Sequence, residues 1–175
     1  MSKVSIALRG WRFDEDDVFD QDGDLKALGE MPADSRHRIV RLAQISGDAC
    51  DACWLLHGEA DIHRANQGTI VYGEPMAEVL LCADHEADFL YWFREAGGSA
   101  SAGDAEFPDR FHEWFADGNR APEDYEGLDH VEGEAGAYGF REASACGLDD
   151  VAHELDEMDR AEAEATDVDL DALDL

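Results

Sequence analysis

The sequence predicts a small α+β protein whose centre is a tetrahedral metal site, flanked by an N-terminal strand and by helices. Two ligand pairs of the same spacing, Cys50-x2-Cys53 and Cys82-x2-His85, are the first observation behind this prediction. The second is that two β-favouring runs lie between the pairs, and that two helical patterns rich in aromatic residues follow them. Together these features indicate a compact fold in which metal and aromatic core form one unit.

Residues 3–9 begin the chain with an alternating pattern that predicts a strand with one buried face. The apolar residues of this pattern are Val4, Ile6 and Leu8. After Gly10 the large side chains of Trp11 and Phe13 fall on the opposite parity, so we expect a bulge or bend at the glycine. Residues 14–30 are expected to form an acidic connection with a single turn of helix near Leu25 and Leu28.

A helix is expected from Pro32 to Ser46, since proline favours the first turn of a helix and Gly47 ends the pattern. Its apolar face comprises Ile39, Val40, Leu42 and Ala43. Beside this face lies the most basic group of the chain, namely Arg36, His37, Arg38 and Arg41. The simpler interpretation is that the arginines pair with carboxylates, and the alternative is a surface that contacts nucleic acid or phosphate.

A β-hairpin is predicted between the two ligand pairs. The runs 69–72 and 77–81 favour strands, and the Gly-Glu-Pro-Met segment between them is typical of a turn. The second strand leads directly to Cys82, so we expect the hairpin to carry one ligand to the site.

A helix from His85 to Ala96 follows, with Asp84 as its expected N-cap and two glycines, Gly97 and Gly98, at its end. At 100° per residue, the histidine shares a face with the aromatic residues of this helix. That face comprises His85, Phe89, Trp92, Phe93 and Ala96. The helix is therefore expected to bury its aromatic side where its first turn offers a ligand.

A second aromatic helix is expected over residues 107–117, after a small-residue linker. Its apolar face comprises Phe107, Phe111, Trp114 and Phe115. Aromatic residues at helical spacing usually belong to a core, so we expect the two aromatic helices to pack on each other or on the sheet. A role in stacking on a cofactor or a base is the alternative.

The composition changes after residue 125, which predicts a zinc-binding domain over residues 1–125 and an acidic, partly disordered tail over residues 126–175. One short helix is expected in this tail, from the stripe Leu148, Val151, Ala152, Leu155 and Met158. The acidic–hydrophobic C-terminus is interpreted as solvated, with docking into a partner's groove as the alternative. Cys146 belongs to no ligand pattern and is interpreted as a spectator thiol.

The predicted ligands of one structural zinc ion per chain are Cys50, Cys53, Cys82 and His85. Three thiolates and one imidazole fill a tetrahedron and leave no position for water, so the metal is expected to hold structure rather than act as a Lewis acid. His57, four residues after Cys53, is the alternative fourth ligand, ahead of His63. Reduced cysteines in a metal-free core are the simpler alternative.

This order of ligand pair, hairpin and second pair at the start of a helix resembles the treble-clef class of zinc fingers over residues 48–97. The resemblance implies a zinc knuckle at the first pair, a structural zinc and a small α+β fold, in a class that serves nucleic-acid binding, protein binding and nuclease chemistry alike. Treble-clef nucleases of the His-Asn-His kind place a catalytic histidine on the first hairpin strand. Here His63 and Asn66 precede the predicted hairpin, which disfavours a nuclease.

The chain is strongly acidic, with 43 Asp and Glu against 13 Lys and Arg and a net charge of −30. These carboxylates are spread over every segment, which favours adaptation to molar salt, where charges are screened within about 3 Å. The alternative is an acidic partner-binding protein that mimics nucleic acid. The whole chain also resembles a group of uncharacterised proteins from salt-adapted archaea, and this resemblance implies no function.

The sequence also bears on localisation and on function. No apolar run is long enough for a membrane span and the N-terminal residues lack a signal-peptide core, so we expect a cytoplasmic protein without membrane contact.

The main functional hypothesis is a non-enzymatic, regulatory interaction module that binds protein or nucleic acid, the latter through the basic group of the 32–46 helix. The alternative is a metal-dependent hydrolase or nuclease that uses His57 or His63.

Overall fold

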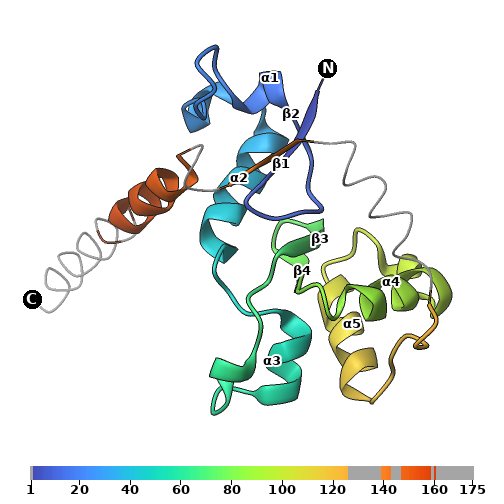
Figure 1. Cartoon of the computed structure of the whole chain (residues 1–175). Helices are drawn as coiled ribbons and strands as arrows, with labels where there is room; N and C mark the ends of the chain where they lie inside the picture. The colour runs from blue at the N-terminus through green and yellow to red at the C-terminus, as the bar shows by residue number, and fades with distance from the viewer. Residues whose placement is uncertain (1, 126–138, 143–146, 159, 161–175) are drawn as a thin grey trace, which may run out of the picture.

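The computed structural model describes residues 2–125, 139–142, 147–158 and 160. It is a mixed α+β fold in which two small sheets are accompanied by short helices, so the predicted α+β class is confirmed (Figure 1). The α-helices are α1 (Glu15–Val18), α2 (Ala33–Ile45), α3 (Asp51–His57), α4 (Glu86–Glu95), α5 (Phe107–Ala116) and residues 148–158. Short 3-10 helices are η1 (Leu28–Glu30), η2 (Ile62–Arg64) and η3 (Gly98–Ser101).

The first sheet consists of the N-terminal strand and two very short partners. β1 (Lys3–Ile6) lies in the middle, antiparallel to β2 (Phe13–Asp14) and parallel to β5 (Gly139–Arg141). β1 is shorter than the expected strand over residues 3–9, because Ala7 adopts a positive φ of 62° and the chain leaves the sheet there.

The bend expected at Gly10 is confirmed, and it joins the first sheet to the hairpin. Gly10 has a φ of +113°, and a Cβ atom there would lie 1.8 Å from the carbonyl oxygen of Val71. The approach is this close because the amide of Val71 donates to the carbonyl of Arg9 at 2.8 Å. Only glycine fits such a position, and the turn that it permits buries both Trp11 and Phe13.

The hairpin of β3 (Ile70–Glu74) and β4 (Ala77–Leu81) lies between two hydrophobic cores and contributes side chains to both (Figure 1). Successive side chains of a strand point to opposite faces, so each strand contributes to both sides. Val71 and Leu80 belong to the first core, whereas the opposite side carries Ile70, Val79 and Leu81. The hairpin therefore couples the N-terminal half of the fold to the half that carries the predicted ligands.

The first core lies between the N-terminal sheet and α2. As expected, α2 begins after Pro32 and ends before Gly47, and it buries three apolar residues, Ile39, Leu42 and Ile45. They meet apolar residues of β1, of the bend and of the connection to α2, namely Val4, Ile6, Leu8, Trp11, Phe13, Val18, Phe19 and Met31. This core fixes the position of α2 against the hairpin.

The second core is aromatic and is built by α4 and α5, as predicted. Phe89 lies at its centre, with ring centroids 4.8 Å from Tyr72, 5.4 Å from Phe111 and 5.6 Å from Trp92. Such offset and edge-to-face pairs add to the stabilisation that comes from burying the rings. The predicted packing of one aromatic helix on the other is confirmed, although Ala96 is exposed and Leu90 takes part instead.

Two local predictions are wrong. The hairpin turn consists of Pro75 and Met76 alone, because Gly73 continues the ladder opposite Glu78. The N-cap of α4 is His85 rather than Asp84, whose carboxylate instead accepts a hydrogen bond from Asn66.

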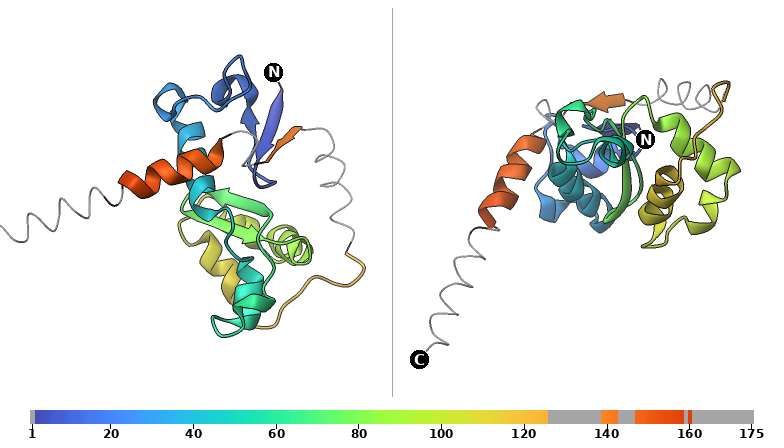
Figure 2. Two further views of the ribbon diagram at one scale, coloured as in Figure 1. Left: turned by 60° about the vertical axis from the view of Figure 1, so that its left-hand side comes forward. Right: turned by 90° about the horizontal axis from the view of Figure 1, so that it is seen from below.

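Two segments beyond residue 125 join the first core. β5 pairs with β1, and Leu148 of the helical residues 148–158 is buried in that core (Figure 2). The helix expected from the Leu148 stripe is thus confirmed, whereas the domain division at residue 125 stays a prediction. The predicted acidic C-terminus and Cys146 lie outside the described residues. Within the described part of the chain, no helix combines the length and hydropathy that crossing a bilayer requires.

Candidate metal centre

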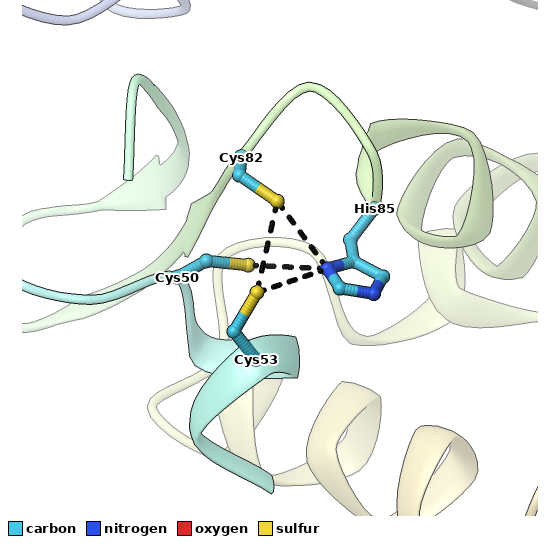
Figure 3. A group of neighbouring side chains, drawn as sticks. All are labelled: Cys50, Cys53, Cys82 and His85. Atoms are coloured by element: carbon cyan, nitrogen blue, oxygen red, sulfur yellow. Dashed lines mark hydrogen bonds between the residues drawn. The ribbon is translucent and has the colours of Figure 1, made fainter. Parts of the chain in front are cut away.

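The four predicted ligands come together where two helices begin (Figure 3). Cys50 is the N-cap of α3 and Cys53 lies in its first turn, so the two sulfur atoms face the same side. Cys82 follows β4 directly, and His85 caps α4 after a turn closed by a hydrogen bond of 3.2 Å from its amide to the carbonyl of Cys82. All three cysteines are buried.

The first pair does not lie on the zinc knuckle that the treble-clef resemblance implies. It lies on the first turn of a helix, since the segment from Asp51 to His57 contains no glycine or proline and continues as helix until Gly58.

Four of the six donor separations match the edges of a tetrahedral site. The sulfur atoms of Cys53 and Cys82 are 3.8 Å apart. Nδ1 of His85 lies 3.6, 3.5 and 3.3 Å from the sulfur atoms of Cys50, Cys53 and Cys82, and all four donors lie within 4.8 Å of one another. Metal–sulfur bonds of about 2.3 Å and metal–nitrogen bonds of about 2.0 Å give tetrahedral edges of about 3.8 and 3.5 Å. A disulfide would need sulfur atoms about 2.0 Å apart.

Burial favours the uncharged forms of three of these ligands. It raises the pKa of the Cys50 thiol to about 12. This effect outweighs hydrogen bonds from the backbone of Cys53 and Cys82, which lower the pKa. It also raises the pKa of the Cys53 thiol and lowers the pKa of His85. A metal ion must therefore displace thiol protons, whereas the imidazole is already unprotonated at neutral pH.

Asn66 supports the ligands from a segment that the sequence did not connect with the site. Its side-chain amide lies 3.6 Å from the sulfur of Cys82 and donates to Asp84 at 3.1 Å. The backbone carbonyl of Asn66 accepts a hydrogen bond of 2.8 Å from the backbone amide of Cys50, which holds the start of α3 in place. Sixteen residues separate Asn66 from Cys82, and no spacing rule links an amide at that distance to a ligand pair.

The helix α5 covers the histidine. The ring of Phe115 meets the imidazole of His85 edge-on at 5.6 Å, and the guanidinium of Arg120 lies 3.5 Å from the centre of that phenyl ring. The second aromatic helix therefore packs on the ligand itself as well as on α4. This joins metal site and aromatic core more closely than the pattern of α4 alone predicted.

The alternative histidines lie outside this group of four. His57 is the last residue of α3 and His63 lies on η2, and neither contributes a donor atom to the described cluster. The basic residues of α2 contribute no donor atom to this cluster either. Arg41 contacts Glu78 at 2.6 Å and Arg38 approaches Glu74 at 3.7 Å, so these two arginines pair with carboxylates of the hairpin.

The geometry allows one chemical role plainly, which is the binding of a metal ion. Three sulfur atoms and one imidazole nitrogen, from four residues close in space, can hold one ion without a ligand from elsewhere. Bound in this way, the ion would fasten α3 to the junction of β4 and α4. Twenty-eight residues lie between the two ligand pairs in the sequence.

Comparison with known proteins adds a family to this description. A family model described as a family of unknown function, DUF8114, matches residues 1–174. No curated protein and no solved structure matches the chain.

Proposed function

Because the chain belongs to a protein family of unknown function, DUF8114, its role has to come from its own residues, and we propose that it is a zinc-stabilised interaction module. The observation that carries this proposal is the complete set of four donors at tetrahedral separations. A centre filled by protein ligands has no position for water or substrate, and such sites hold folds together.

Zinc is the ion that this donor set favours. Thiolate and imidazole ligands in a tetrahedron are typical of structural zinc sites, and harder ions such as Mg²⁺ and Ca²⁺ prefer oxygen. One ion per chain is proposed, because the described residues contain a single cluster of this kind. The hairpin followed by a ligand pair at a helix start supports a relation to the treble-clef class, in a variant whose first pair lies on a helix.

A protein partner is favoured over nucleic acid. The net charge of −30, which we attribute to adaptation to molar salt, is screened there and says little about the partner. The basic group on α2 offers less positive charge than the sequence suggested, since Arg38 and Arg41 are paired with Glu74 and Glu78. Binding of RNA or DNA in filter assays at high salt would contradict this choice.

The enzymatic alternative is tested by exchanging the two histidines beside the centre. His57→Ala and His63→Ala are expected to keep one zinc per chain and to leave the unfolding transition within about 0.5 kcal/mol of the parent protein, because His63 is exposed and His57 is only partly buried. His85→Ala is the matched change within the cluster, and it should lose the metal. A hydrolytic activity on generic ester, peptide or nucleic-acid substrates that disappears in His57→Ala or His63→Ala with zinc retained would overturn the non-enzymatic proposal.

The apparent zinc affinity is expected to rise with pH. Burial holds the pKa values of Cys50 and Cys53 above neutral pH, so binding displaces a proton from each thiol. Release of about two protons or more per ion corresponds to an affinity gain of about 100-fold or more per pH unit. His85 adds no proton at neutral pH, because its pKa is lowered. Competition with a chelator of known affinity between about pH 6.5 and 8 measures the slope, and a pH-independent affinity would contradict the thiolate ligands.

A further inference from the structure

A cleft with a cavity volume of about 600 Å³ lies beside the metal centre, between the end of α2, the start of α3, η2 and β4. One side of it is apolar and comes from Trp54 of α3 and Ile62 of η2, which are 45% and 43% exposed. In a chain with such an acidic composition, large apolar side chains exposed next to a cavity are typical of a binding surface. The metal-binding turn of α3 holds this apolar side in place.

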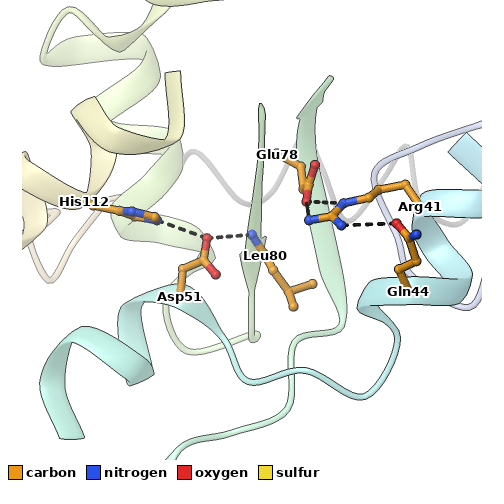
Figure 4. A network of polar contacts seen from close by, with 6 residues as sticks. All are labelled: Arg41, Gln44, Asp51, Glu78, Leu80 and His112. Carbon is orange, nitrogen blue, oxygen red and sulfur yellow. Dashed lines mark hydrogen bonds and ion pairs between the residues drawn. The ribbon is translucent and has the colours of Figure 1, made fainter. Parts of the chain in front are cut away.

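The cleft also carries an excess of negative charge. Three carboxylates line it, from Asp48, Asp51 and Glu78, and Arg41 is the single cation among its lining residues. Asp51 is held rigidly, since it accepts the amide of Leu80 at 3.2 Å and lies 3.1 Å from Nε2 of His112 (Figure 4). The excess of negative charge favours a cationic group in the cleft.

Glu78 has a hydrogen-bonding capacity that the fold does not use. Its side chain is only 8% exposed, and Nε and Nη2 of Arg41 both contact the same oxygen, Oε1, at 2.7 and 2.6 Å (Figure 4). The second oxygen, Oε2, is buried and has no hydrogen-bond partner within the described part of the chain. A buried carboxylate oxygen without a donor is unfavourable, so an N–H group of a ligand in the cleft would gain free energy from a bond to Glu78 once the side chain turns this oxygen toward the cleft.

The geometry points to this cleft as the docking site for an arginine side chain of a protein partner, flanked by apolar residues. An arginine has an aliphatic stem for Ile62, a planar cation that can stack on Trp54, and several N–H donors for Glu78. A protein segment fits better than a free cation, because the cleft also exposes two large apolar side chains, Trp54 and Ile62. This inference deepens the proposed function and rests on it, since it names the surface and the partner chemistry of the same zinc-held helix.

A titration of the zinc-loaded full chain with short peptides, followed by amide NMR spectra, tests the assignment. The probe is acetyl-Leu-Arg-Leu-amide, and its control carries citrulline, the neutral isostere, in place of arginine. The arginine peptide is expected to shift the indole N–H of Trp54 and the amides of residues 48–51, and to bind at least about tenfold more tightly than the citrulline peptide. Acetyl-arginine-amide alone is expected to bind more weakly than the tripeptide, because it lacks the apolar flanks.

Two variants with matched controls locate the site. Glu78→Gln and Trp54→Ala are each expected to weaken binding of the arginine peptide about tenfold. Glu74→Gln removes another arginine-paired carboxylate of the hairpin, and Met76→Ala another exposed apolar side chain, so both should change the affinity less than about twofold. Trp54→Ala keeps the test valid if Glu78→Gln disturbs the fold, since Trp54 is nearly half exposed.

Several outcomes would overturn the inference. These are equal binding of the arginine and citrulline peptides, equal binding of the tripeptide and acetyl-arginine-amide, shifts that map to Arg36 and His37 instead, or an RNA decamer that perturbs the cleft. Zinc content and the unfolding midpoint are measured on the same samples. A chain that holds one zinc and binds no peptide overturns this inference alone, whereas a folded chain that holds no zinc overturns the proposed function as well.

Discussion

Cys82→Ser is expected to abolish stoichiometric zinc binding and to unfold the aromatic half of the protein. The sulfur of Cys82 lies 3.8 Å from that of Cys53 and 3.3 Å from Nδ1 of His85, so its loss leaves three donors and opens the centre. A structural zinc site contributes about 10 kcal/mol or more of binding free energy that is also folding free energy, and we expect a loss on the order of 5 kcal/mol or more. Metal analysis of the purified protein and near-ultraviolet circular dichroism measure the two effects.

Two controls separate loss of a ligand from loss of a cysteine or a histidine. Cys146→Ser removes the remaining cysteine of the sequence, and His57→Ala removes a histidine on the same helix as Cys53. Both are expected to retain one zinc per chain, and addition of a strong chelator to either should reproduce the Cys82→Ser spectrum. A Cys82→Ser protein with unchanged zinc content and an unchanged unfolding transition would show that these residues do not hold a structural metal.

Arg9→Met is expected to destabilise the fold by about 3 kcal/mol. Nη2 of Arg9 lies 2.8 Å from Oε2 of Glu86, whose side chain is only 5% exposed, and Tyr72 donates to the other oxygen at 2.7 Å. Removing the arginine leaves a buried carboxylate without its counter-ion, which typically destabilises a protein by 3–5 kcal/mol. The lower end of that range applies, because the Arg9 side chain is 34% exposed. Denaturant unfolding at constant zinc concentration measures the change.

A double-mutant cycle and a surface pair provide the comparison. Adding Glu86→Gln to Arg9→Met removes the unpaired charge, so the double variant should recover most of the lost stability. Arg110→Met breaks an i,i+4 pair with Glu106, in which both side chains are more than half exposed, and should change the stability by less than about 0.5 kcal/mol. Equal losses for Arg9→Met and Arg110→Met would show that the Arg9–Glu86 pair stabilises the fold no more than an exposed pair does.

The sequence alone predicted the features that depend on short spacings. The two residues of each pair, Cys50–Cys53 and Cys82–His85, are only three positions apart. Both pairs could therefore be recognised from the sequence without knowledge of the fold. Helical periodicity likewise identified α2, α4 and α5 with errors of one residue at their ends. Capping was less predictable, since Asp84 is a favourable N-cap residue by type, but Asn66 binds its carboxylate instead.

Contacts between distant segments were decided by the tertiary structure. Glu86 lies in the first turn of α4, where the sequence pattern gives no sign that its carboxylate is buried. In the structure the carboxylate is buried and contacts Arg9 and Tyr72. The cleft beside α3 forms only because α2 and β4 bring Arg41 and Glu78 opposite Trp54. No sequence periodicity predicts contacts between residues so far apart in the chain. These contacts depend on which core each face of the hairpin packs against.

Local spacing and the chemistry of thiols and imidazoles were therefore enough to predict the candidate ligands, their pairing and the α+β class. The tertiary structure decided that the first pair lies on a helix and that Asn66 and Phe115 support the ligands. It also left one oxygen of Glu78 buried without a donor beside an open cleft. These features could not be predicted from the sequence because burial and hydrogen bonding depend on contacts between residues that are far apart in the chain.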